Sequence, residues 1–208
     1  MNNTIEIIKR LRKEYDGYTT ALNYKTPFQL LLATILSAQC TDKRVNIVTK
    51  ELFKKYKTPK DFANLANEEL EPLIKSTGFY KNKAKNIIAA SKKLQNEFNS
   101  QIPDNMEDLL KLPGVARKTA NIVLHYAYGI EEGIAVDTHV KRVAYRLGLT
   151  KNTNPDKIEK DLINIIPKEY WKDVNNLIVW HGRLVCKAQK PDCDNCIIND
   201  LCAFNISK

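Results

Sequence analysis

Residues 112–120 read Leu-Pro-Gly-Val-Ala-Arg-Lys-Thr-Ala and stand between two segments with helical periodicity. Gly114 can adopt a positive φ without the steric cost of a Cβ, so the chain can turn back sharply here. The turn leads into a helix N-terminus, where unpaired amides and the helix dipole favour an anion. Arg117 adds positive charge nearby. The sequence predicts a helical hairpin over about residues 105–128 that binds a phosphate, with a plain αα-hairpin as the alternative.

Proline and capping side chains mark helix starts elsewhere in the chain. Thr26-Pro27, Thr58-Pro59 and Asn154-Pro155 each place a capping oxygen before a proline suited to the first helical turn. Asp104 with Glu107 resembles a capping box. Only residues 133–136 look extended, and they are too few to seed a sheet. We therefore predict an all-α fold, with helices over residues 27–40, 42–56, 61–65, 67–77, 80–98, 106–110, 116–128, 138–147, 155–166 and 169–185.

The longest expected helix, residues 80–98, is amphipathic. Its apolar positions recur at core spacing through Ala84, Ile87 and Leu94, and we expect its lysines on the opposite, solvated side. The whole chain of 208 residues carries a formal charge of +9. That charge suits a polyanion such as nucleic acid, although its excess of lysine is equally explained by genome composition.

Four cysteines stand near the C-terminus as Cys186-x6-Cys193-x2-Cys196-x5-Cys202. Thiolates at such short, uneven spacings can close around one metal centre, either tetrahedral zinc or a four-iron four-sulfur cluster. Zinc sites usually pair two short knuckles, whereas here one tight knuckle is flanked by wider spacings, which favours the cluster. Two disulfides are disfavoured because the chain shows no signal peptide and the cytosol keeps thiols reduced. Cys40 is interpreted as a buried free thiol.

Taken together, these motifs resemble the endonuclease III family of DNA glycosylases. Residues 112–120 look like its helix-hairpin-helix motif. Val136-Asp137-Thr138-His139, Leu36-Ser37-Ala38-Gln39 and the cysteine spacing agree with it, and the similarity spans roughly residues 5–204. Many relatives carry a second glycine where this chain has Ala116, whose methyl group slightly restricts how closely a phosphate approaches.

The resemblance implies that Lys118 is the nucleophile that attacks the sugar C1′ of a damaged nucleotide. A primary amine can displace the base, form an iminium with the opened sugar and so acidify C2′ for β-elimination. The attacking amine must be neutral, and the first turn of a helix disfavours an ammonium. Partial desolvation in a cleft would act in the same direction. The alternative is a lysine that only contacts phosphate.

Asp137 precedes an expected helix, so the residue pattern alone predicts an N-cap. The resemblance implies a second role, in which its carboxylate stabilises positive charge developing on the sugar and helps to manage the lysine proton. Both roles are compatible, because a capping carboxylate already has a fixed direction.

The resemblance also implies contacts with DNA. A base must leave the stack to be excised, and Gln39 is the candidate to fill the gap. Phe79 stands where relatives place an intercalating residue, often leucine, with ordinary packing after a glycine turn as the alternative. His139 faces either the DNA backbone or solvent. The full set of expected DNA contacts is Gly114, Val115, Ala116, Arg117, Gln39, Phe79, His139, Lys187 and Lys190.

We therefore expect a two-lobed helix-hairpin-helix glycosylase fold with an iron-sulfur loop near its C-terminus. Residues 22–132 would form a helical bundle, and residues 1–21 with 133–208 would form the domain that holds one 4Fe-4S cluster at the four cysteines. The cluster would stiffen a loop that faces DNA. Lys118 and Asp137 would both reach the cleft between the lobes.

The expected activity is base excision repair: removal of oxidised pyrimidines and strand cleavage through a lysine Schiff base. The partner would be double-stranded DNA with damaged bases or abasic sites, bound by a monomer in the cytoplasm and associated with the nucleoid. No apolar run is long enough to span a membrane. The alternatives are an adenine-mismatch glycosylase, which typically lacks this lysine, and a non-catalytic, metal-stabilised DNA-binding module.

Overall fold

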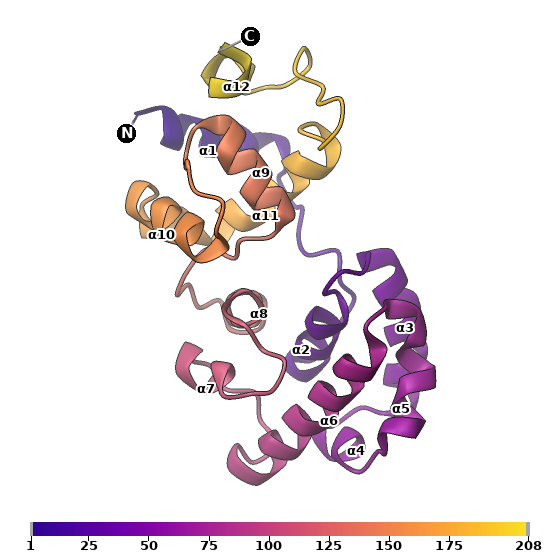
Figure 1. The fold of residues 1–208 in the computed structure, drawn as a ribbon. Coiled ribbons are helices and arrows are strands. Elements are labelled where there is room, and N and C mark those ends of the chain that lie inside the picture. Colours follow the sequence, from indigo (N-terminus) through magenta and orange to yellow (C-terminus); the bar gives the residue numbers. More distant parts are fainter. Residues whose placement is uncertain (1, 207–208) are drawn as a thin grey trace. The chain divides into compact units, whose positions relative to one another are not determined.

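The computed structural model describes residues 2–206, and Figure 1 shows how their helices follow one another. These residues form helices, turns and irregular segments without a strand, so the predicted all-α class is confirmed. Residues 133–136, which looked extended in the sequence, are an irregular buried segment. None of the helices between residues 2 and 206 is both long and apolar enough to cross a bilayer.

Contacts divide the chain into two compact units. One holds the residues up to Thr19 and those from Glu131 onward, and the other holds Thr20–Ile130. The limits lie close to those expected at residues 22 and 132, and the assignment of the units as domains stays a prediction. Residues 1, 207 and 208, which belong to the expected domain of residues 1–21 with 133–208, lie outside the described residues.

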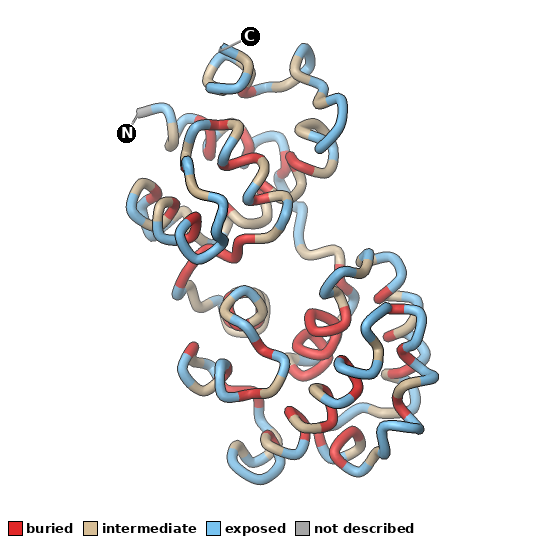
Figure 2. Tube along the Cα trace, in the orientation of Figure 1, coloured by how far each residue is buried: buried red, intermediate tan, exposed pale blue. Residues whose placement is uncertain are grey.

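The unit Thr20–Ile130 is built around α2 (Pro27–Leu36), in which every residue after Pro27 is buried. Figure 2 shows this burial as a continuous red helix. A helix that is apolar on all sides must be covered on all sides. The elements that make up the rest of the unit are α3 (Asp42–Lys55), α4 (Pro59–Ala63), α5 (Asn67–Ile74), the 3-10 turn η1 (Lys75–Thr77), α6 (Tyr80–Glu97), α7 (Met106–Leu110), α8 (Arg117–Val123) and the π-helical turn η2 (Leu124–Tyr128).

The second unit packs the first helix of the chain against its C-terminal part. α11 (Trp171–Leu184) contacts both α1 (Asn2–Glu14) and α9 (Thr138–Leu147), and the apolar side chains between them are buried. The remaining elements of this unit are α10 (Pro155–Ile165), the 3-10 turns η3 (Lys168–Tyr170) and η4 (Asn199–Leu201), and α12 (Ala203–Ile206). The C-terminal cysteines lie on this unit.

Local sequence sets several of the helix starts as predicted. Thr26 Oγ1 accepts a hydrogen bond from the Gln29 amide at 3.2 Å, directly before Pro27. Thr58 and Asp61 form a reciprocal capping box at the start of α4. Such a cap contributes about 1 kcal/mol to helix stability. The capping roles of Thr26 and Thr58 are confirmed, since each cap and its proline lie within one helical turn.

Other expected boundaries are wrong. α2 ends at Leu36 rather than residue 40, because the Ser37 amide closes the helix on Ala33 O and Gln39 takes a φ of 53°. α4 occupies Pro59–Ala63 rather than residues 61–65. The cap of α7 is Asn105 rather than Asp104, since Asn105 Oδ1 accepts from the Asp108 amide at 2.9 Å. The solvated lysine face expected for α6 also has an exception, because Lys83 is only 5% exposed.

Candidate functional site

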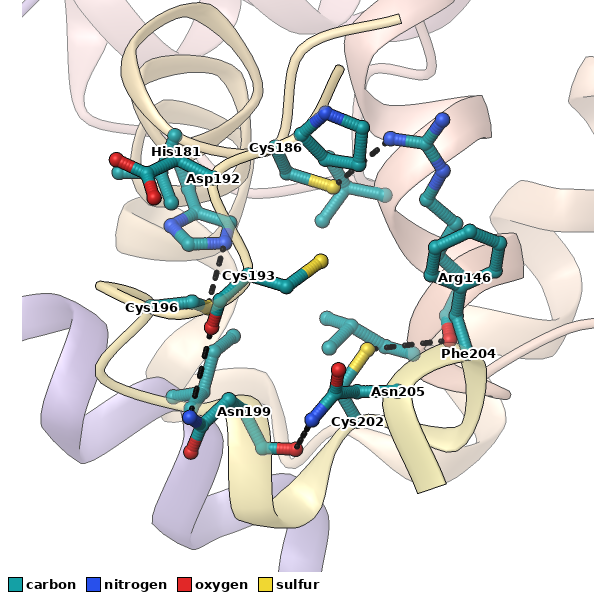
Figure 3. Close-up of a pocket in the computed structure, with 15 residues that line it drawn as sticks. Arg146, His181, Cys186, Asp192, Cys193, Cys196, Asn199, Cys202, Phe204 and Asn205 are labelled. Atoms are coloured by element: carbon teal, nitrogen blue, oxygen red, sulfur yellow. Dashed lines mark hydrogen bonds between the residues drawn. The ribbon is translucent and has the colours of Figure 1, made fainter. Parts of the chain in front are cut away.

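The C-terminal cysteines surround one cavity. Cys186 follows α11, Cys193 and Cys196 lie in the loop beyond it, and Cys202 ends η4. All of these thiols are half-buried and free of disulfides. They line a common cavity. Figure 3 shows the sulfurs of Cys186, Cys193 and Cys202 pointing into this space.

The loop between the cysteines is held by hydrogen bonds from Arg146 on α9. Its guanidinium donates to Lys187 O at 2.7 Å, to Ala188 O at 3.0 Å and to the sulfur of Cys186 at 3.3 Å. Its charged end also lies 5.0 Å from the ring centre of Phe204. One side chain thus fixes the loop and places a positive charge beside a thiol.

The donor set fits a polynuclear iron-sulfur centre. The sulfurs are spread around a cavity, and apolar side chains such as Val143 and Ile198 line the rest of it. Between residues 2 and 206, no three His, Cys, Asp or Glu side chains gather closely enough to share one metal ion. Burial raises the pKa of the Cys196 thiol. Metal binding therefore has to displace a proton there.

The hairpin forms where the sequence predicts it. α7 and α8 flank the turn, and η2 continues α8 to Tyr128. Gly114 has a φ of +81°, in the left-handed region that favours glycine. Ala116 occupies the N-cap position of α8 and supplies no side-chain cap. The last turn before Gly129 is π-helical rather than α-helical, a departure often found near functional sites.

Gly114→Ala is expected to destabilise the protein through both its backbone and its packing. A Cβ there would lie 2.8 Å from the Cβ of Asn86, and that atom cannot rotate away. We expect a loss of about 2–4 kcal/mol, from the strained φ and from overpacking. Gly129→Ala is the matched control, because its φ is +67° but nothing lies within 4 Å of its Cβ position. Urea unfolding midpoints measure both variants, and equal losses would contradict the steric part of the argument.

Lys118 stands in the first turn of α8, and its side chain is exposed. The partial desolvation expected for the Lys118 amine is therefore not provided by the free protein. An exposed amine in the first turn of α8 is nevertheless accessible to a macromolecular substrate.

Asp137 is the N-cap of α9, as the residue pattern predicted. Its Oδ1 accepts from the amides of His139 and Val140, both at 2.8 Å. Among residues 2–206, Oδ2 has no hydrogen-bond donor assigned to it. One oxygen therefore holds the carboxylate in place while the other is available for chemistry.

His139 lies against α11 rather than simply facing solvent. It is half-buried, and its Nδ1 lies 3.2 Å from Nη2 of Arg142. Gly182 leaves room for it, since a Cβ there would approach both His139 and Arg142 at 3.1 Å. Burial lowers the pKa of His139.

The other expected DNA contacts are exposed. Gln39 and Phe79 both adopt positive φ, and Phe79 leaves 62% of its surface open to solvent. Lys187 and Lys190 are exposed on the cysteine loop, which Arg146 fixes through its carbonyls. Cys40 is half-buried rather than buried, and it lies next to Gln39.

Sequence reasoning missed two residues that shape these segments, Arg146 and Lys83. Arg146 gave no local signal, because its partners lie about 40 residues away in the chain. Lys83 did give one: residues 83, 87, 90 and 94 follow helical spacing, and all of them are buried. The pattern placed a lysine in an apolar row.

Comparison with known families agrees with this geometry. The family model of HhH-GPD superfamily base excision DNA repair proteins matches residues 32–168. The model of the iron-sulfur binding domain of endonuclease III matches residues 186–202, which span the cavity cysteines. Residues 186–202 therefore form an iron-sulfur binding segment, and the zinc and disulfide alternatives are not supported.

Curated relatives extend the match over nearly the whole chain. An endonuclease III from Synechocystis is 54% identical over 197 residues, covering 95% of this chain and 90% of that protein. An endonuclease III from Bacillus subtilis is 47% identical, covering 87% and 83%. That of Escherichia coli strain K12 is 42% identical, covering 96% and 94%.

Solved structures give the same result. A non-covalent endonuclease III–DNA complex superposes with a TM-score of 0.94 at 42% identity, covering 99% of this chain and 96% of the other. A trapped covalent endonuclease III–DNA intermediate superposes with a TM-score of 0.93 at 42% identity, covering 100% and 98%. The predicted resemblance is confirmed: the chain belongs to the endonuclease III family, within the HhH-GPD superfamily of base excision DNA repair proteins.

Proposed function

We propose that this protein is a bifunctional DNA glycosylase and abasic-site lyase that removes oxidised pyrimidines from double-stranded DNA. The observation that carries the proposal is the exposed amine of Lys118, which the hairpin presents in the first turn of α8. A relative that is 42% identical has been trapped covalently on DNA, which supports an amine nucleophile here. No observation favours the adenine-mismatch or the non-catalytic alternative.

Base removal is the first chemical step. The lone pair of the neutral Lys118 amine forms a bond to C1′, and the bond between C1′ and the base breaks. The base leaves with the electron pair of the broken C1′–base bond and takes up a proton. Because the side chain is exposed in the free protein, the water around it is displaced by the bound DNA itself. The attack requires the neutral amine, whose lone pair is the nucleophile.

Strand cleavage follows from the same covalent bond. The Lys118 nitrogen loses a proton, the bond between C1′ and O4′ breaks, and O4′ takes up a proton. The sugar is then open and joined to Lys118 by an iminium between C1′ and the nitrogen. The iminium acidifies C2′, a proton leaves that carbon, and the bond from C3′ to its phosphate oxygen breaks. Water then hydrolyses the iminium and regenerates the lysine. The products are a strand broken 3′ to the lesion and a free enzyme.

Asp137 is the residue proposed to stabilise the cationic sugar. Its Oδ1 is occupied by the amides of His139 and Val140, so the carboxylate is fixed before substrate arrives. The other oxygen is the one that would face positive charge on the sugar and accept the proton that Lys118 must lose. A carboxylate that is already oriented needs no reorganisation during the reaction.

Access to C1′ requires that the damaged nucleotide leaves the base stack. Gln39 and Phe79 are the proposed residues that fill the vacated space. Both are exposed, and 62% of the surface of Phe79 is open to solvent, so its ring is accessible to DNA bases. The flat face of Phe79 suits stacking between bases.

Binding to the DNA backbone is proposed for the hairpin and the cysteine loop. Gly114, Val115, Ala116 and Arg117 form the turn that would meet a phosphate. Lys187 and Lys190 are exposed on the loop that Arg146 holds, and the net charge of +9 favours a polyanion. His139 would contribute less, because it is half-buried against α11.

One 4Fe-4S cluster is the proposed cofactor, held by Cys186, Cys193, Cys196 and Cys202. When bound, it supplies four metal–sulfur bonds that fix the loop, a structural role that needs no electron transfer in the glycosylase reaction. We further propose that the protein acts as a monomer in the cytoplasm, associated with the nucleoid through its substrate.

A panel of defined duplexes tests the proposed substrate range. Wild-type protein should release thymine glycol and form a borohydride-trapped adduct, while leaving undamaged DNA intact. Release of adenine opposite 8-oxoguanine without an adduct would contradict the proposal and favour the mismatch enzyme. Binding to every duplex without release or adduct would favour the DNA-binding module.

A further inference from the structure

Lys83 is a buried cation with hydrogen bonds to two separate segments. Its side chain belongs to α6 and is only 5% exposed. The ammonium donates to Leu36 O and to Thr77 O, each at 2.8 Å. The first of these carbonyls is 47 residues away in the chain and the second is 6 residues away. One ammonium group therefore joins two places that the sequence separates.

Both carbonyls lie at the ends of helical elements. Leu36 is the last residue of α2, and Thr77 is the last residue of η1. The final carbonyls of a helix have no partner within that helix and carry partial negative charge, so an ammonium suits them. Lys83 thereby completes the C-terminal ends of both elements.

This arrangement is costly for the protein. Burial lowers the pKa of Lys83, and the ion pairs found among residues 2–206 do not include it. A buried charge held by neutral carbonyls gives up more solvation than an uncharged side chain would. An apolar side chain in the same row of α6 would fill the space without the desolvation penalty of a charge. The position therefore calls for an explanation beyond packing.

The two tied segments lead directly into the two residues proposed to enter DNA. We name residues 37–40 the glutamine loop and residues 77–79 the phenylalanine loop. Gln39 has a φ of 53° and Phe79 a φ of 49°, backbone conformations that residues other than glycine rarely adopt. Such backbone strain persists only where the surrounding structure enforces it. The ammonium of Lys83 is anchored at the base of both loops.

We propose that Lys83 is a positioning residue for base extrusion, which holds the glutamine loop and the phenylalanine loop at a fixed separation so that both side chains enter the DNA together. This inference rests on the proposed function and deepens it. Lys83 touches neither the lesion nor the sugar. It acts through the two loops, which preorganises them before DNA binds.

The proposal predicts that loss of Lys83 separates two activities. Release of an intact damaged base requires full extrusion and a filled gap. Cleavage at a pre-formed abasic site requires much less, because no base has to be unstacked. A merely structural lysine would lower both activities together, in proportion to the fraction of folded protein.

Lys83→Met keeps the length of the side chain and removes its charge. The matched control is Lys92→Met, on the same helix at an exposed position. Active molecules are counted by borohydride trapping on abasic DNA, and thymine-glycol excision is then measured per active molecule under single-turnover conditions. We expect excision by Lys83→Met to fall about tenfold to a hundredfold, because a displacement of about 1 Å has an effect of that size. Abasic-site cleavage per active molecule should stay within about twofold, and Lys92→Met should match wild type in both assays.

Lys83→Gln is the second variant, since a neutral amide donor retains part of the hydrogen bonding. It should show the same split at a smaller amplitude. A 2-aminopurine opposite the lesion provides a second readout, because its fluorescence rises when it is unstacked, and that rise should be smaller in both variants.

Equal loss of the two activities, no loss in either, or failure of both variants to yield trappable protein would each overturn the proposal. Absence of an adduct with wild-type protein would instead overturn the proposed function.

Discussion

Lys118→Gln is expected to abolish strand cleavage at abasic sites and at thymine glycol. Glutamine has nearly the same length as lysine but no nucleophilic amine, so the covalent route is closed while the hairpin remains intact. Removal of a covalent nucleophile typically costs about 10⁴-fold or more in rate. Single-turnover nicking of end-labelled duplexes measures this loss. DNA binding should change much less, because one lysine supplies one of many backbone charges.

The matched control is Lys92→Gln, an exposed lysine of α6 that has no proposed role. It should cleave at the wild-type rate, which shows that loss of one positive charge does not account for the effect. Cleavage by Lys118→Gln at wild-type speed would mean that another nucleophile performs the reaction. The mechanistic assignment would then be wrong, although family membership would stand.

Cys193→Ala is expected to have the second large effect. The sulfur of Cys193 points into the cavity, as do those of Cys186 and Cys202 (Figure 3). We expect the iron content to fall from about four atoms per chain to well below one, together with loss of the brown colour. The loop of residues 186–202 would then lose its internal anchor, and DNA affinity should drop about tenfold or more with it.

Cys40→Ala is the control for Cys193→Ala. Cys40 is also a free, half-buried thiol, but it belongs to the other unit and lies outside the cavity. It should keep the full iron content. Metal and sulfide analysis with fluorescence anisotropy on a labelled duplex measures both outcomes. Full iron occupancy in Cys193→Ala would exclude this residue as a ligand, and one zinc ion per wild-type chain would contradict the cluster.

Local chemistry explains which parts of the fold were predictable. The start of α2 follows from Thr26 and Pro27, which act within one turn of each other. Asp137 caps α9 for the same reason, and Gly114 takes the positive φ that its turn requires. The cysteine spacing predicted a shared centre, since each intervening loop is long enough to turn the next sulfur inward. These features depend on residues that are close in the chain.

Long-range contacts explain what the sequence did not show. The C-terminal end of α2 also meets a distant side chain, because the ammonium of Lys83 donates to Leu36 O from 47 residues away. Lys83 was expected on the solvated face of α6 and is buried instead. The carbonyl groups that it binds belong to other segments, so the sequence of α6 does not reveal them. Arg146 was missed because its role is to bind the backbone of a distant loop. The N-cap of α7 is Asn105 rather than the expected Asp104. Both residue types cap helices well, so sequence preference alone does not decide between two adjacent positions.

The most direct test of this account is to find the atom that becomes bonded to DNA. Wild-type protein is incubated with a thymine-glycol duplex and borohydride, digested, and analysed by mass spectrometry. The account predicts that the reduced sugar is carried on the peptide that contains Lys118, at its side-chain nitrogen, in a single population. An adduct on a different lysine or on the chain's amino terminus, or cleavage with no adduct at all, would contradict it.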